Sequence, residues 1–126
     1  MNKLYIKAQG NKPIKHGVDW GSEEQPNLTG IQLVQVSPEG IALNSMSLSV
    51  KEHGEEGEGL PEGYVAMCVW LLAKDSEIVV PRAEMDWRLL FIAMRRYMVE
   101  GIDKEFKKLK HTVDAEAVDQ HIGTTH

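Results

Sequence analysis

Residues 82–110 read RAEMDWRLLFIAMRRYMVEGIDKEFKKLK, and this stretch decides the fold expected from the sequence. Its large apolar side chains recur every three or four positions, which is the spacing of one face of an α-helix. Acidic residues stand near its start and lysines near its end, as the helix dipole favours. The sequence therefore predicts one long C-terminal helix over residues 82–110, bent but continuous at Gly101.

The same helix carries more apolar surface than one contact with a sheet requires. Leu89, Ile92 and Val99 point away from its broad apolar face, and Arg95 and Arg96 share their side. An apolar stripe flanked by arginines has the composition of a partner surface. We therefore predict that these five residues mediate self-association as a symmetric homodimer.

The alternative is that this stripe is covered within one chain. Residues 10–30 contain several glycines and prolines and show little periodicity, so they predict a long irregular loop. Trp20 lies in this loop and is a candidate anchor on the rest of the domain. A loop packed over the helix would bury Leu89 and Ile92 without a second copy.

Short β-rich segments precede the helix. The sequence Ser-Pro-Glu-Gly at residues 37–40 is typical of a turn and predicts a hairpin between the strands that flank it. Residues 64–73 are apolar on both sides, which favours a central strand of a covered sheet, with a buried helix as the alternative. The expected strands cover residues 4–8, 31–36, 41–50, 64–73 and 78–80.

These elements predict an α+β fold, with about five mostly antiparallel strands packed on one long C-terminal helix. The length of 126 residues fits a single domain, to which we assign residues 1–110. Residues 111–126 have only scattered apolar positions, so we expect a weakly structured C-terminal tail there.

Charge is unevenly distributed along the chain. The net charge of −5 is made up of −5 in residues 1–80, +3 in residues 81–110 and −3 in residues 111–126. An acidic protein has little non-specific attraction to nucleic acid or to an anionic membrane, and the apolar runs are too short to span a bilayer. The single cysteine, Cys68, and the lack of a signal sequence favour a reducing, cytoplasmic location.

The most acidic segment covers residues 51–59, with the sequence KEHGEEGEG and no apolar side chain. Repulsion between its carboxylates predicts a mobile tip. Its candidate contacts to a basic surface on a partner protein are Glu52, Glu55, Glu56 and Glu58. A loop that only increases solubility is the alternative.

The sequence has no phosphate-binding glycine loop, no Cys-x-x-Cys and no His-Glu-x-x-His motif. We therefore predict no cofactor, no metal site and no catalytic residue, and we identify no known family from these residues. Cys68 lies in an apolar run, which favours a buried, unreactive thiol over a nucleophile.

The resulting hypothesis is a non-enzymatic protein-interaction module of the inhibitor, immunity or adaptor type, acting through the acidic loop and the helix stripe. Two alternatives stay open. The basic side of the helix could bind nucleic acid in a regulatory role. A small enzyme could assemble its site in a dimer cleft from His16, Asp19 and the loop that contains them.

Overall fold

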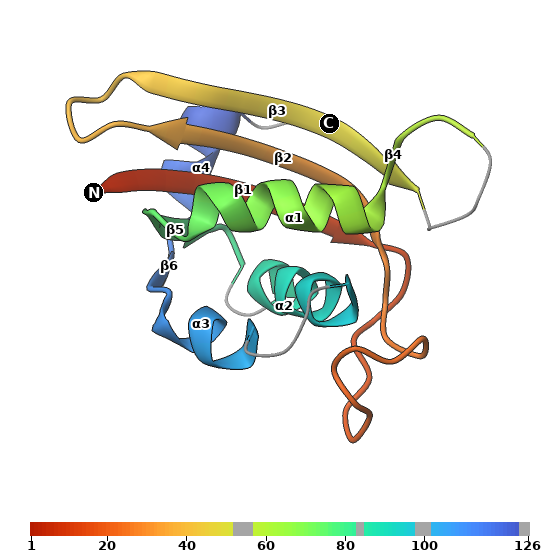
Figure 1. Ribbon diagram of the computed structural model, residues 1–126. Coiled ribbons are helices and arrows are strands. Elements are labelled where there is room, and N and C mark those ends of the chain that lie inside the picture. The colour runs from red at the N-terminus through yellow and green to blue at the C-terminus, as the bar shows by residue number, and fades with distance from the viewer. Residues whose placement is uncertain (52–56, 83–84, 98–101, 124–126) are drawn as a thin grey trace.

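The computed structural model describes residues 1–51, 57–82, 85–97 and 102–123, and these form an α+β fold as the sequence predicts (Figure 1). The strands are β1 (Asn2–Gly10), β2 (Leu28–Val36), β3 (Ala42–Lys51), β4 (Leu60–Pro61), β5 (Ser76–Val80) and β6 (His111–Val113). The helices are α1 (Glu62–Ala73), α2 (Met85–Tyr97), α3 (Ile102–Lys108) and α4 (Ala115–Ile122). None of the described helices is both long enough and apolar enough to cross a membrane.

The strands form one mixed sheet in the order β4-β3-β2-β1-β5-β6. The long pairs β1–β2 and β2–β3 are antiparallel, whereas β5 is parallel to both of its neighbours, β1 and β6. Helices explain the parallel pairs of β5, because α1 precedes β5 and both α2 and α3 lie between β5 and β6. Such crossovers return the chain to the same end of the sheet. The short β4 is also parallel to β3. The sheet therefore has more parallel pairing than the sequence predicted.

Helices lie on both faces of the sheet (Figure 1). Leu4, Ile6 and Ala8 of β1 are buried in the main core together with apolar residues of α1 and α2. Tyr5 points to the other face, where it packs in a smaller cluster with Val118 of α4. This alternation is the pattern of a central strand that is covered on both faces.

Residues 64–73, predicted as a strand, belong to α1, so the strand interpretation is wrong and the buried-helix alternative describes the chain. Val65, Ala66, Val69 and Ala73 recur at helical spacing, and all four are buried. The residues between them are also apolar. The segment therefore lacks the polar positions that would have revealed its helical period.

The single helix predicted over residues 82–110 is divided into α2 and α3, and residues 98–101 between them lie outside the described residues. The ring of Trp87 in α2 stacks on that of Phe106 in α3 with their centroids 4.2 Å apart. A continuous helix would separate these two positions by about 28 Å. The chain therefore folds back between the two helices, and the prediction of one continuous helix is corrected.

Residues 111–122 contain β6 and α4, where the sequence predicts a weakly structured tail. The carboxylate of Asp114 caps α4 by accepting a hydrogen bond of 3.0 Å from the backbone N–H of Ala117. Val118 is fully buried against Tyr5 and Val79 of the sheet. The helix α4 thus contributes to a second, smaller core.

The long loop predicted after the first strand is confirmed, and it packs on α2. Trp20 contacts Phe91 of α2 edge to face, with ring centroids 5.6 Å apart, and the Arg88 guanidinium lies 6.0 Å from the Trp20 ring. Gln25 is fully buried, and its side-chain amide bonds to the backbone N–H and C=O of Lys15 at 3.0 and 2.9 Å. Trp20 therefore anchors the loop on α2, and Gln25 links two parts of the loop to each other.

Candidate functional site

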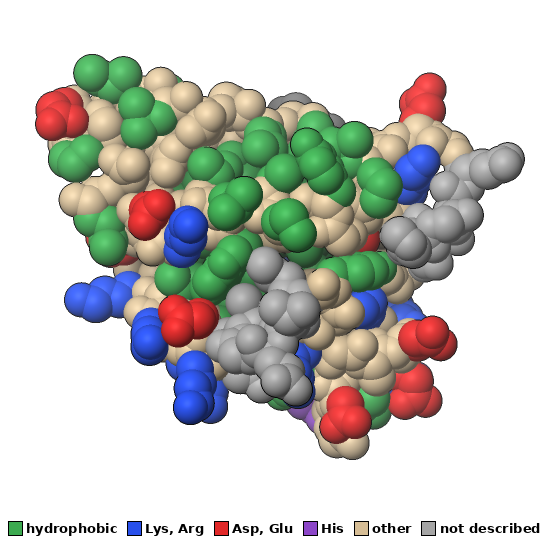
Figure 2. Space-filling model, in the orientation of Figure 1, with side chains coloured by type: hydrophobic (Ala, Val, Ile, Leu, Met, Phe, Trp, Pro, Cys, Tyr) green, Lys and Arg blue, Asp and Glu red, His purple; other side chains and the backbone are tan. Residues whose placement is uncertain are grey.

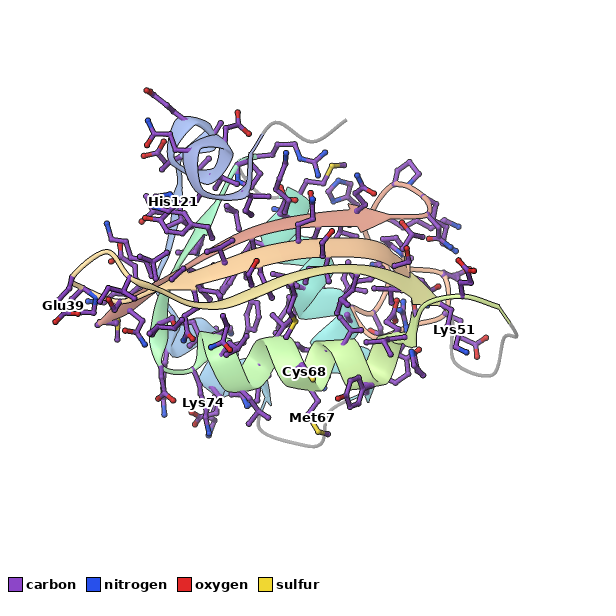
Figure 3. All side chains as sticks on the ribbon, turned by 90° about the horizontal axis from the view of Figure 1, so that it is seen from above. Glu39, Lys51, Met67, Cys68, Lys74 and His121 are labelled. Carbon is purple, nitrogen blue, oxygen red and sulfur yellow. The ribbon has the colours of Figure 1, made fainter. Side chains whose placement is uncertain are left out.

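An exposed apolar ridge lies on α1. Tyr64, Met67 and Leu71 are 59%, 54% and 52% exposed, and their spacing of three and four residues aligns them along one side of the helix. We call these three residues the α1 ridge. Hydrophobic side chains gather over α1 in Figure 2, and in Figure 3 Met67 extends from the helix away from the sheet. The ridge is therefore open to a partner.

The composition of α1 is unusual for a helix that is open to solvent. Residues 63–73 contain no charged side chain, so the helix is apolar on all sides. A helix of this kind is normally buried all round. Each side chain of the α1 ridge is more than half exposed, and contiguous exposed apolar patches often contact other proteins.

A buried ion pair fixes the beginning of α1. The side chain of Glu62, the first residue of α1, has no exposed area, and its Oε1 lies 2.6 Å from Nη1 of Arg96 in α2. The same carboxylate accepts a hydrogen bond of 3.2 Å from the Asn27 amide and another from the backbone N–H of Leu28. These donors offset the cost of removing a carboxylate from water.

Arg96 also holds the long loop. Its Nη2 donates hydrogen bonds to the carbonyl oxygens of Ser22, Gln25 and Pro26 at 3.1, 3.0 and 3.1 Å. One guanidinium therefore connects α2, the loop and the first residue of α1. The α1 ridge is presented by a helix with a fixed end, which reduces the entropy lost when a partner binds.

A second buried carboxylate connects α2 to β1. Asp86 accepts a hydrogen bond of 2.8 Å from the backbone N–H of Ala8 and bonds of 3.1 Å from Nε and Nη2 of Arg82. The hydrogen bond to Asp86 raises the pKa of Arg82, and partial burial opposes this effect. The guanidinium stays charged, and its Nη2 also donates to the Ala8 carbonyl at 3.0 Å.

An open groove of about 530 Å³ crosses β1, β2 and β3 near Arg82. Its lining combines the hydroxyls of Ser47 and Ser49 with the cations of Lys7 and Arg82. Lys7 also lies 3.8 Å from the carboxylate of Asp119 in α4. None of the lining residues is an acid, a histidine or a cysteine. The groove therefore lacks the groups that most often act as general acids or bases.

The stripe predicted to mediate self-association is covered in this structure. Leu89 is 4% exposed and Ile92 is fully buried. A side chain at Gly10 would come within 2.8 Å of Leu89, and one at Gly21 within 3.2 Å of Arg95, so the chain after β1 lies directly on α2. Leu89 and Ile92 are buried within one chain, so their assignment to an exposed dimer surface is corrected.

The remaining residues of that stripe do not form one surface. Arg95 is exposed near the end of α2, whereas Arg96 is paired inside the molecule with Glu62. Val99 lies outside the described residues. Arg96 is therefore a structural residue of this chain, which its position in the sequence could not reveal.

The acidic loop is described only in part. Glu58 is exposed and stands shortly before β4 and α1. The other three predicted contacts, Glu52, Glu55 and Glu56, lie outside the described residues. A partner that contacts Glu58 would therefore be close to the beginning of α1.

The residues considered for an enzymatic site lie on the surface of the long loop. His16 and Asp19 are both exposed on the loop, and neither lines the 530 Å³ groove or a neighbouring groove of about 460 Å³ beside Met85. Among the described residues, no three His, Cys, Asp or Glu side chains are grouped so that they could hold a metal ion. Cys68 is half-buried on α1.

Sequence reasoning missed the α1 ridge, although a signal for it was present. Tyr64, Met67 and Leu71 have helical spacing, but they lie within a run in which nearly every residue is apolar. The ridge becomes visible only when the run is recognised as a helix and its buried side is known.

Comparisons with known protein families and with curated protein sequences find no match to this chain. The function must therefore be argued from the geometry of its own residues.

Proposed function

We propose that this protein is a non-enzymatic interaction module that binds a partner protein through the α1 ridge. The observation that carries the proposal is a solvent-exposed apolar side on α1, formed by Tyr64, Met67 and Leu71 within the uncharged stretch of residues 63–73. Solvent exposure of these side chains is unfavourable, and docking of an apolar partner surface would remove it.

The ridge fits a complementary apolar groove or helix on the partner. Tyr64 and Leu71 are about 10 Å apart along the helix axis, with Met67 between them, which is the spacing of anchors in helix-in-groove recognition. Tyrosine is common among residues that dominate binding energy, and methionine adapts to irregular surfaces. Because the ridge is uncharged, we expect its own contribution to the affinity to change little with salt, as measured on the variant that lacks the loop acids.

The acidic loop is the second part of this proposal. Glu58 is exposed beside the beginning of α1, so a partner with a basic rim around an apolar groove could contact both features. Replacement of the loop acids by glutamine should then slow association more than it speeds dissociation, as measured by surface plasmon resonance. The variant for this experiment carries Gln at Glu52, Glu55, Glu56 and Glu58.

Replacement of Met67 by glutamate should abolish partner binding without unfolding the chain. Met67 is 54% exposed, so the new carboxylate stays hydrated in the free protein but would be buried without a partner charge in the complex. We expect at least a tenfold loss of affinity. Proteins captured from a cognate lysate by the wild type and by Met67→Glu are quantified by mass spectrometry, and the dissociation constant is then measured with the purified partner.

Met85→Glu is the matched control for this experiment. It makes the same change at a methionine that is 44% exposed on α2, away from the ridge. A partner retained by Met85→Glu and lost by Met67→Glu supports the proposal. If every captured protein binds all three forms equally, the α1 ridge is not a binding surface.

The nucleic-acid alternative has one specific observation in its favour. Lys104, Lys107 and Lys108 are exposed on α3, although Lys108 is paired with the interleaved Glu105 at 3.1 Å. Because the net charge is −5, we expect a labelled oligonucleotide at low salt to bind the wild type no better than a variant with glutamine at the three lysines. Fluorescence anisotropy measures this, and salt-sensitive binding lost in the variant would favour the alternative.

A further inference from the structure

The outer edge of β3 is open along most of its length. β3 pairs with β2 from Ala42 to Ser49, but on its other side β4 pairs only with Val50 and Lys51. No other described strand pairs with this edge. In the sheet order, only the short β4 lies beyond β3 on this side. Alternate residues of 42–49 therefore direct backbone N–H and C=O groups away from the sheet.

This edge lacks the features with which most proteins block edge pairing. Residues 41–50 read IALNSMSLSV and contain no charged residue and no proline. The register shift in the β2–β3 pair lies near Ala42, at the hairpin end, and the rest of the pairing is regular. About 26 Å of strand is therefore available as a template for another strand.

The side of α1 next to this edge is also partly apolar. Cys68 and Leu72 are half-buried and share one side of the helix, while Gly63, on the other side, lies against the Tyr97 ring of α2. Figure 3 is seen from the β3 edge, and α1 runs alongside β3 in this view. Met46 and Leu48 of β3 are partly buried against the core that α1 covers. The open edge thus continues into an apolar strip.

We propose that a second copy of this chain pairs with this edge, β3 against β3 in antiparallel orientation across a two-fold axis. The pairing joins the two sheets, places both α1 helices on one face, and encloses Met46 and Leu48 of both copies between them. Each chain has a net charge of −5, but the edge is neutral, so the copies meet where their repulsion is smallest.

The size of this surface reaches the lower limit for a specific interface. A specific interface needs about 500 Å² from each copy. The surface formed by the open β3 edge and the adjoining side of α1 is about 26 Å long. Its depth is roughly 20 Å, the combined thickness of one sheet layer and one helix. An antiparallel pair of identical strands also repeats the same contacts on both sides of the axis, as an isologous interface requires.

The test combines sedimentation equilibrium over a range of concentrations with amide hydrogen exchange. We expect the wild type to dimerise and its amides in residues 43–49 to gain protection as the concentration rises. Ser45→Lys combined with Ser47→Lys changes two exposed side chains and places like charges opposite each other in the dimer. This variant should stay folded and dimerise at least tenfold more weakly.

Thr112→Lys is the matched control, because it adds a lysine to the exposed β6 at the other end of the sheet order and should leave the dimer unchanged. A wild type that stays monomeric overturns the proposal, and so does a dimer that is retained by the double lysine variant or that gives no protection in β3. The inference is independent of the α1 ridge. Met67→Glu should therefore keep the dimer while it loses partner binding.

Discussion

Replacement of Ile92 by glutamate should leave the chain unfolded. The Ile92 side chain is fully buried in α2, and a carboxylate at this position would be removed from water. An unpaired buried charge costs several kcal/mol or more, against a total stability of about 5–15 kcal/mol for a typical domain. Far-ultraviolet circular dichroism and the dispersion of amide signals in nuclear magnetic resonance spectra measure the outcome.

Two control variants separate the effect of the buried charge from the loss of the side chain and from the addition of a charge to α2. Ile92→Ala removes the same side chain without adding a charge, and it should lower the free energy of unfolding by about 2–5 kcal/mol in urea titrations. Arg95→Glu places a carboxylate on the exposed part of the same helix and should stay folded. A folded, monomeric Ile92→Glu would instead mean that this side of α2 is a surface, as the homodimer prediction requires.

The features that the sequence predicts correctly depend on local signals. The turn at residues 37–40 has its Ser, Pro and Gly in the favoured positions, and Gly40 donates a hydrogen bond of 2.9 Å to the Ser37 carbonyl with a positive φ of 86°. The first helical segment of residues 82–110 has a regular apolar period and forms α2. Both conclusions rest on residues a few positions apart.

The features that the sequence does not predict depend on contacts between distant residues. Arg96 donates hydrogen bonds to carbonyl oxygens of residues that precede it by 70 to 74 positions. These hydrogen bonds hold the long loop on α2. Nothing in the pattern around Leu89 and Ile92 distinguishes a stripe covered by such a loop from one covered by a second copy. The exposure of the α1 ridge and of the β3 edge likewise depends on which elements pack beside them, and the local sequence does not contain this information.

Replacement of Glu62 by alanine should lower the free energy of unfolding by about 3–5 kcal/mol. The variant leaves Arg96, whose side chain is only 11% exposed, without its carboxylate, and it leaves the Leu28 N–H and the Asn27 amide without an acceptor. Urea titration followed by circular dichroism measures the loss. Glu39→Ala, at an exposed turn position, should change stability by less than about 0.5 kcal/mol.

A double variant separates the ion pair from the space that it fills. Glu62→Met combined with Arg96→Met replaces both charges by apolar side chains, so neither partner is left as an uncompensated buried charge. We expect the double variant to be more stable than the sum of the two single methionine variants predicts, by about 1–3 kcal/mol. If the single effects simply add, the pair contributes little coupling, and hydrogen bonds to the loop carbonyls alone hold Arg96. In that case the end of α1, and the ridge that follows it, would depend on the loop rather than on Glu62.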